Sequence, residues 1–179
     1  MRYAAALASV VLLAGCSSPS TGTSTPTATA TEQTSVAPVA FASAGGSAEV
    51  VAALAEHVPT ITLTTAFTED NDPNKQLGRP GGYIGKAAFA DSRVPTADRN
   101  EDKAATDNGG GVEIFTTAGD AQARSEYIAA ALKGGGGMLG TEYLYVSGPA
   151  LLRVSGNLTP TMAREYEAAW PGVVAEVLK

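Results

Sequence analysis

The sequence has few of the residues on which most active sites and disulfide-stabilised domains depend. Its 179 residues include one cysteine and one histidine. A lone cysteine cannot form an internal disulfide, and the ligands of a typical zinc site are missing. The motifs G-x-S-x-G, S-x-x-K and H-E-x-x-H do not occur, so no serine lies in a recognisable nucleophile motif. We therefore predict a protein without histidine-dependent catalysis and without a cofactor.

Positive charge and aromatic residues are also scarce. The chain has 12 Lys and Arg against 18 Asp and Glu, which gives a formal net charge of -6. Proteins that bind nucleic acid neutralise phosphates with basic residues, so this balance argues against a nucleic-acid partner. Aromatic residues make up 6% of the chain, so a group of them on one exposed surface would be a candidate binding site.

The longest apolar run near the N-terminus, YAAALASVVLL at residues 3–13, is too short to span a membrane. It has the length of a signal peptide core, and the sequence LAGC follows at residues 13–16. This motif resembles the lipobox of bacterial lipoproteins. The resemblance implies that residues 1–15 are removed and that Cys16 carries a diacylglyceryl group at the extracytoplasmic face of the cell membrane. The alternative is a plain secretory signal in which the cysteine falls there by chance.

A change of composition divides the rest of the chain into two parts. Residues 17–38 consist mostly of Ser and Thr with Pro and Ala, and they contain no aromatic residue. Such a segment cannot bury enough apolar surface to offset the entropy lost on ordering. We therefore interpret residues 16–38 as the lipidated cysteine and a disordered tether, and residues 39–179 as one folded domain.

Periodic apolar residues and capping residues predict three helices in this domain. They span residues 47–58, 117–132 and 159–170. Ser47, Thr117 and Thr159 are the expected caps, with Pro160 at the first position of the third helix. Pro171 is expected to break that helix, with one further turn after it.

Apolar runs, several of them alternating with polar residues, predict five strands. They span residues 60–67, 83–90, 112–116, 142–147 and 151–155. The last two are expected to form a hairpin at Gly148-Pro149, and residues 68–82 and 91–110 are predicted as long loops. Strands that follow one another along the chain favour antiparallel pairing. The predicted fold is an α+β two-layer sandwich, with a mainly antiparallel sheet of about five strands and about three helices on one face.

Two loops contain patterns that partly match known ligand-binding motifs. Residues 135–140 match G-x-G-x-x-G, but they follow a predicted helix and precede a strand, the reverse of a dinucleotide-binding loop. Asp70, Asp72 and Asn74 have the spacing that opens a calcium loop, although Lys75 and Gly81 occupy positions where such loops need Gly and Glu. We expect these three residues to hydrogen-bond nearby backbone in turns and predict no metal site; the alternative is that they are calcium ligands.

Two segments of the domain resemble small secreted lipoproteins of actinobacteria. One is DPNKQLGRPGGY at residues 72–83, and the other is LLRVSGNLTP at residues 151–160. The resemblance covers about residues 60–170. It implies a secreted lipoprotein, and it carries over no catalytic residue.

The alternation of the predicted strands suggests a binding surface on the sheet. We expect Leu144, Val146, Leu152 and Val154 on one face of the hairpin, with Tyr143, Tyr145 and Arg153 on the other. Phe115 and Glu113 are expected to join the second face, and Arg79 of the 68–82 loop is a further binding candidate. The alternative is that the tyrosines lie on a half-wet sheet face or beneath one of the long loops.

Three functions are compatible with these observations. The first is a membrane-anchored envelope lipoprotein whose non-catalytic domain binds another envelope protein or a cell-wall component. The second is a prophage-type lipoprotein that excludes an incoming phage. The third is an envelope hydrolase that uses carboxylates of the 68–82 loop, namely Glu69, Asp70 or Asp72, as an acid–base pair.

Overall fold

The computed structural model describes residues 46–179, so the predicted signal peptide, Cys16 and the tether lie outside the described residues. Ten elements follow one another along this part of the chain. They are α1 (Gly46–His57), β1 (Ile61–Ala66), β2 (Gly85–Asp91), the 3-10 turns η1 (Thr96–Asp98) and η2 (Thr106–Asn108), β3 (Gly109–Ile114), α2 (Ala118–Gly134), β4 (Glu142–Ser147), β5 (Ala150–Ser155) and α3 (Pro160–Val177). Among residues 46–179, no helix has both the length and the apolar composition that a membrane crossing requires.

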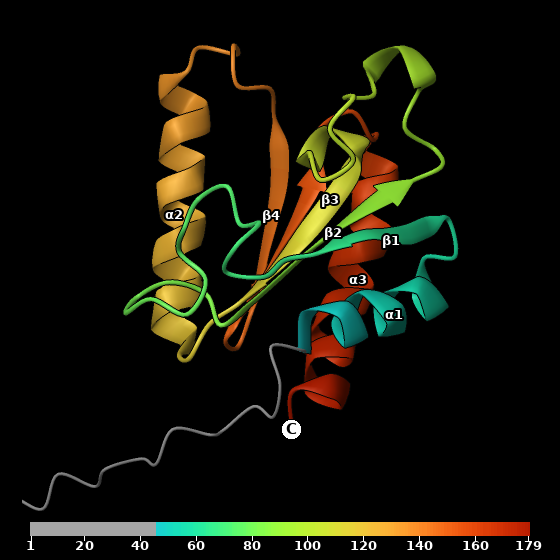
Figure 1. Cartoon of the computed structure of the whole chain (residues 1–179). Coiled ribbons are helices and arrows are strands. Elements are labelled where there is room, and N and C mark those ends of the chain that lie inside the picture. Colours follow the sequence, from blue (N-terminus) through green and yellow to red (C-terminus); the bar gives the residue numbers. More distant parts are fainter. Residues whose placement is uncertain (1–45) are drawn as a thin grey trace, which may run out of the picture. The chain divides into compact units, whose positions relative to one another are not determined.

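The five strands form one open sheet in the order β1-β2-β3-β5-β4, and every neighbouring pair is antiparallel. The predicted α+β class, with a five-stranded antiparallel sheet and three helices, is confirmed. Helices α1 and α3 pack on one face of the sheet, and α2 packs on the other (Figure 1). The prediction that all helices share one face is therefore wrong.

The apolar side chains of the last hairpin explain why both faces are covered. Leu152 and Val154 of β5 belong to the core beneath α1 and α3. Leu151 of the same strand, with Leu144 of β4 beside it, belongs to a second, smaller core beneath α2. Because side chains alternate along a strand, burying both sets requires a helix on each side of the hairpin.

The hairpin turn decides which side chains share a face. The turn has two residues, so Ser147 pairs with Ala150, and Tyr143 consequently lies opposite Val154. Directly opposed residues point to the same face, which places both tyrosines of β4 on the α3 side and Arg153 on the α2 side. The predicted surface of Tyr143, Tyr145 and Arg153 is therefore wrong, because the prediction did not take account of the register across the turn.

The starts of the helices follow their predicted capping residues, with one exception. The side chains of Thr117 and Thr159 accept the backbone N–H groups of Asp120 and Met162, as predicted. Ser47, in contrast, lies inside α1 and is buried. The capping hydrogen bonds of Thr117 and Thr159 fix the starts of α2 and α3.

Pro171 does not break α3, which continues to Val177. Pro171 lies on the exposed side of the helix, so the Glu167 carbonyl that loses its helical partner lies on the side facing solvent. Trp170 and Val173, on either side of the proline in sequence, are buried in the core. Their burial holds the helix together across the missing hydrogen bond.

Candidate functional site

The loop of residues 68–82, called the acidic loop below, is organised around the buried side chain of Asp72. Its carboxylate accepts the backbone N–H groups of Asn74 at 3.3 Å, Gln76 at 2.8 Å and Leu77 at 3.2 Å. One side chain thus satisfies three backbone donors of a segment that has no helix or strand. The expected turn chemistry of this loop is confirmed, and it fixes the loop against the sheet on the α2 side.

Two further side chains complete a buried cluster, which we call the Asp72 network. The Tyr83 hydroxyl donates to the carboxylate at 2.6 Å, and the Lys86 ammonium lies 3.1 Å from it and 4.3 Å from the centre of the Phe67 ring. Burial favours a raised pKa for Asp72, but the hydrogen bonds from Tyr83, Gln76 and Lys86 outweigh it, so its pKa lies well below its usual range. Asp72 is therefore ionised and paired.

The calcium alternative does not agree with this arrangement. The Asp72 carboxylate faces a lysine ammonium and a tyrosine hydroxyl, and it has no solvent exposure. Within residues 46–179, no three or more His, Cys, Asp or Glu side chains are grouped so that they could hold a metal ion. The same burial separates Asp72 from any substrate, whereas Glu69 and Asp70 are exposed on the acidic loop.

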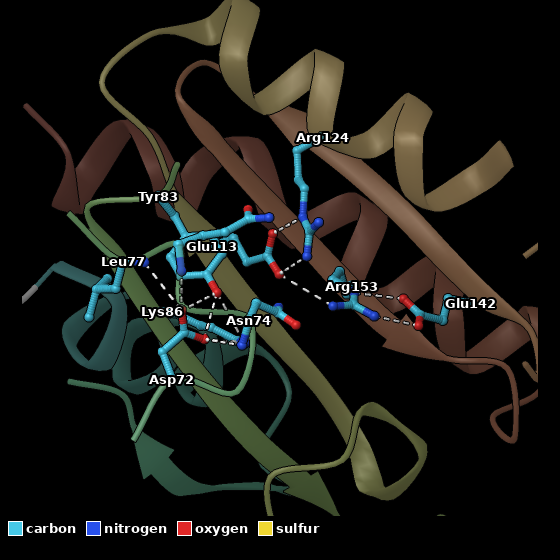
Figure 2. A network of polar contacts seen from close by, with 10 residues as sticks. Asp72, Asn74, Leu77, Tyr83, Lys86, Glu113, Arg124, Glu142 and Arg153 are labelled. Carbon is cyan, nitrogen blue, oxygen red and sulfur yellow. Dashed lines mark hydrogen bonds and ion pairs between the residues drawn. The ribbon is translucent and has the colours of Figure 1, made fainter. Parts of the chain in front are cut away.

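A second group of charges, the arginine network, lies beside the first and comprises Glu113, Arg124, Glu142 and Arg153 (Figure 2). Glu113 of β3 is only 1% exposed. It accepts from Arg124 at 2.8 and 3.3 Å and from Arg153 at 3.3 Å. Two guanidinium groups from different elements are thus held by one buried carboxylate.

Arg153 also makes a two-pronged ion pair across the β4–β5 hairpin. Its Nε and Nη2 atoms donate to the two oxygens of Glu142 at 2.8 and 2.6 Å. Burial favours a lower pKa for Arg153, but the hydrogen bonds to Glu142 and Glu113 outweigh it, so the pKa lies above its usual value. The side chain is therefore a permanent cation with a fixed orientation.

The arginine network borders a cleft of about 350 Å³ between α2, β4 and the acidic loop. Its polar lining comes from all three of these elements and from β5, and its apolar lining comes from α2 and the loop after it. The lining residues are Asn74, Gln76, Arg124, Tyr127, Ile128, Ala131, Leu132, Leu139, Glu142 and Arg153. Six of these ten residues are polar or charged, and oriented polar groups are what give a ligand site its specificity.

The five predicted binding residues are distributed over the structure, and only Arg153 lines this cleft. Phe115 is buried against the Tyr83 ring, with 6.1 Å between ring centres. The hydroxyls of Tyr143 and Tyr145 donate to backbone carbonyls at the start of α3 and just before it. Arg79 is exposed on the acidic loop.

Arg124, which contributes the second guanidinium, was not among the predicted binding residues. A signal for it exists, because Arg124 lies on the stripe that Ala121 and Ile128 define at helical spacing. Both of these residues are buried against the sheet. A charged residue on the apolar stripe of a helix indicates a buried partner across the interface, which here is Glu113.

The lowered pKa of Asp72 predicts a specific acid sensitivity. The contribution of Asp72 to stability is complete above its unfolded pKa of about 3.9, and it is lost as pH falls toward the lower folded pKa. The difference in free energy of unfolding between wild type and Asp72→Asn should therefore shrink as pH falls from 5 to 2. Urea unfolding at several pH values measures it, and a constant difference would contradict this assignment.

Comparisons with protein-family models, curated protein sequences and solved structures returned no match.

Proposed function

We propose that this protein is a lipid-anchored envelope protein whose domain binds a ligand, or a segment of a partner, in the cleft beside the arginine network. The observation that carries the proposal is the pair of guanidinium groups, from Arg124 and Arg153, oriented by the buried Glu113 at the wall of an open cleft. Binding sites need polar groups whose geometry is fixed in advance by a supporting shell.

Stability alone is a poor explanation for this network. Taking charges out of water costs free energy that a buried ion pair often fails to recover, and well-packed apolar residues would serve as well. Here the charged groups lie between a sheet and a helix that are otherwise joined by apolar contacts such as Ile128 and Leu151. A binding role accounts for their presence where this interface opens into a cleft.

The predicted anchor supports the same proposal. Two acyl chains on Cys16 would hold the protein stably at the membrane, and the tether would let the domain sample a radius on the order of 25 Å. Such a reach would allow the domain to meet a partner in the envelope, whether a protein or a cell-wall component. A lipid anchor joined to a tether suits a domain that must present its binding cleft to partners near one point on the membrane.

The test is photo-crosslinking in living cells with the full-length chain. A photoreactive residue replaces Leu139 at the cleft, or Glu167 on the exposed side of α3 as the matched control. We expect specific products from the first position alone, and their loss when Arg124→Gln is added. Radiolabelled palmitate should label wild type and leave Cys16→Ala unlabelled.

Identical products from both positions, or products that persist in Arg124→Gln, would reject the cleft as the binding site. Fatty-acid labelling that does not depend on Cys16 would reject the anchor. The two readouts are independent, so each part of the proposal can fail separately.

A further inference from the structure

We infer that the cleft recognises a carboxylate, bound by the Nη1 group of Arg124, on a molecule whose neighbouring group is apolar. This inference rests on the proposed function and names the chemical class of its ligand. It concerns a small acid or the carboxyl end of a short peptide.

The donor atoms of Arg124 are divided between the protein and the cleft. Nε and Nη2 both donate to Glu113, whereas Nη1 has no hydrogen-bond partner among residues 46–179. The Arg124 side chain is 12% exposed, and Nη1 is not fully buried. Because Glu113 holds the guanidinium plane through Nε and Nη2 (Figure 2), one N–H of Nη1 and the second N–H of Nη2 are left side by side as a parallel pair of donors. A planar carboxylate is a natural acceptor for such an edge.

The formal charge of the arginine network favours a ligand with one negative charge over a ligand with two. The arginine network contains two cations and two anions, so its formal charge is zero. A monocarboxylate adds one negative charge at the arginine edge that the protein leaves open. A phosphate dianion would place twice that charge near Glu142, which lines the same cleft. The side chains of Asn74 and Gln76 in the lining offer amide groups without further charge.

The apolar part of the cleft lining comes from α2 itself, beyond Arg124, and from the segment that follows it. Ile128, Leu132 and Leu139 line it, and Leu139 is 59% exposed. An apolar group on the ligand would cover surface that water now contacts. The volume of about 350 Å³ is at the lower end of the range for ligand sites, which is about 300–1,000 Å³. The cleft therefore suits a molecule of the size of an acylated amino acid or a dipeptide.

The test compares two probes of nearly equal shape, N-acetyl-leucine and its neutral amide, by NMR titration of the full-length protein. We expect the acid to bind at least tenfold more tightly and to shift the Nε–H signal of Arg124. Arg124→Gln should abolish the preference for the acid. Arg164→Gln is the matched control, because Arg164 is exposed on α3 and its one side-chain hydrogen bond within residues 46–179 is to the Thr161 hydroxyl.

Equal binding of acid and amide, no binding of either, or tighter binding of inorganic phosphate than of the acid would each overturn the inference. The shift of the Arg124 signal in wild type keeps the test decisive if the Arg124→Gln variant does not fold. None of these results depends on the crosslinking from position 139. A cleft that crosslinks a partner but ignores the acid would refute the ligand class and leave the proposed function standing.

Discussion

Asp72→Asn should lower the free energy of unfolding by about 3–5 kcal/mol, which is the usual cost of removing one member of a buried ion pair. The substitution keeps the shape of the side chain but removes the charge that faces Lys86 at 3.1 Å. It also replaces a carboxylate that accepts from Tyr83 and from three backbone N–H groups of the acidic loop. Urea unfolding monitored by circular dichroism measures the change.

Asp70→Asn is the matched control, because Asp70 lies in the same loop and its side chain is exposed. We expect its stability to stay within about 0.5 kcal/mol of wild type. In the double variant Asp72→Asn, Lys86→Met, part of the loss should be recovered, because no ammonium is then buried without its carboxylate. A loss below about 1 kcal/mol for Asp72→Asn alone would show that the network does not hold the acidic loop in place.

Gly110→Ala should destabilise the domain by at least about 3 kcal/mol, because β3 has no room for a side chain at this position. A Cβ atom there would overlap the carbonyl oxygen of Arg153 on one neighbouring strand and the ring of Phe89 on the other. Phe89 is fully buried, so its ring has no free space into which it can move. Thermal and urea unfolding of the variant measure the effect.

Gly119→Ala is the control for this prediction. Gly119 lies in the first turn of α2, and the nearest atom to an added Cβ is the Thr117 hydroxyl at 3.7 Å. Alanine favours a helix more than glycine does, so this variant should be as stable as wild type or more stable. Wild-type stability of Gly110→Ala would contradict the close packing of the Phe89 ring against the backbone of Gly110.

Both predictions concern segments that the sequence analysis assigned to loops. Residues 91–110 contain no apolar alternation, so the first residues of β3 had no signal of their own. Gly110 nevertheless pairs with Phe89 and with Val154 in the sheet. The Phe89 ring and the Arg153 carbonyl oxygen, on the two neighbouring strands, fill the space that a side chain at Gly110 would occupy. This packing can be recognised only once the strand pairing is known.

The candidate site shows the same limit more clearly. Glu113 is 11 residues from Arg124 and 40 residues from Arg153, and each is an ordinary charged residue in the sequence. They meet because β3 lies beside β5, and because α2, which packs over β4 and β5, carries Arg124 to Glu113. Arg153 was a binding candidate for a different reason, because it was expected to share a sheet face with Tyr143 and Tyr145. The two-residue turn places those tyrosines on the opposite face of the sheet.

The sequence alone was sufficient for the α+β class, the number of strands and helices, and the capped starts of α2 and α3, because these depend on apolar periodicity and on hydrogen bonds within a few residues. Tertiary structure decided the strand order, the two covered faces, the survival of α3 past Pro171 and the arginine network. Each of these depends on which distant side chains share a face, and a shift of one residue in a strand pairing exchanges the faces completely.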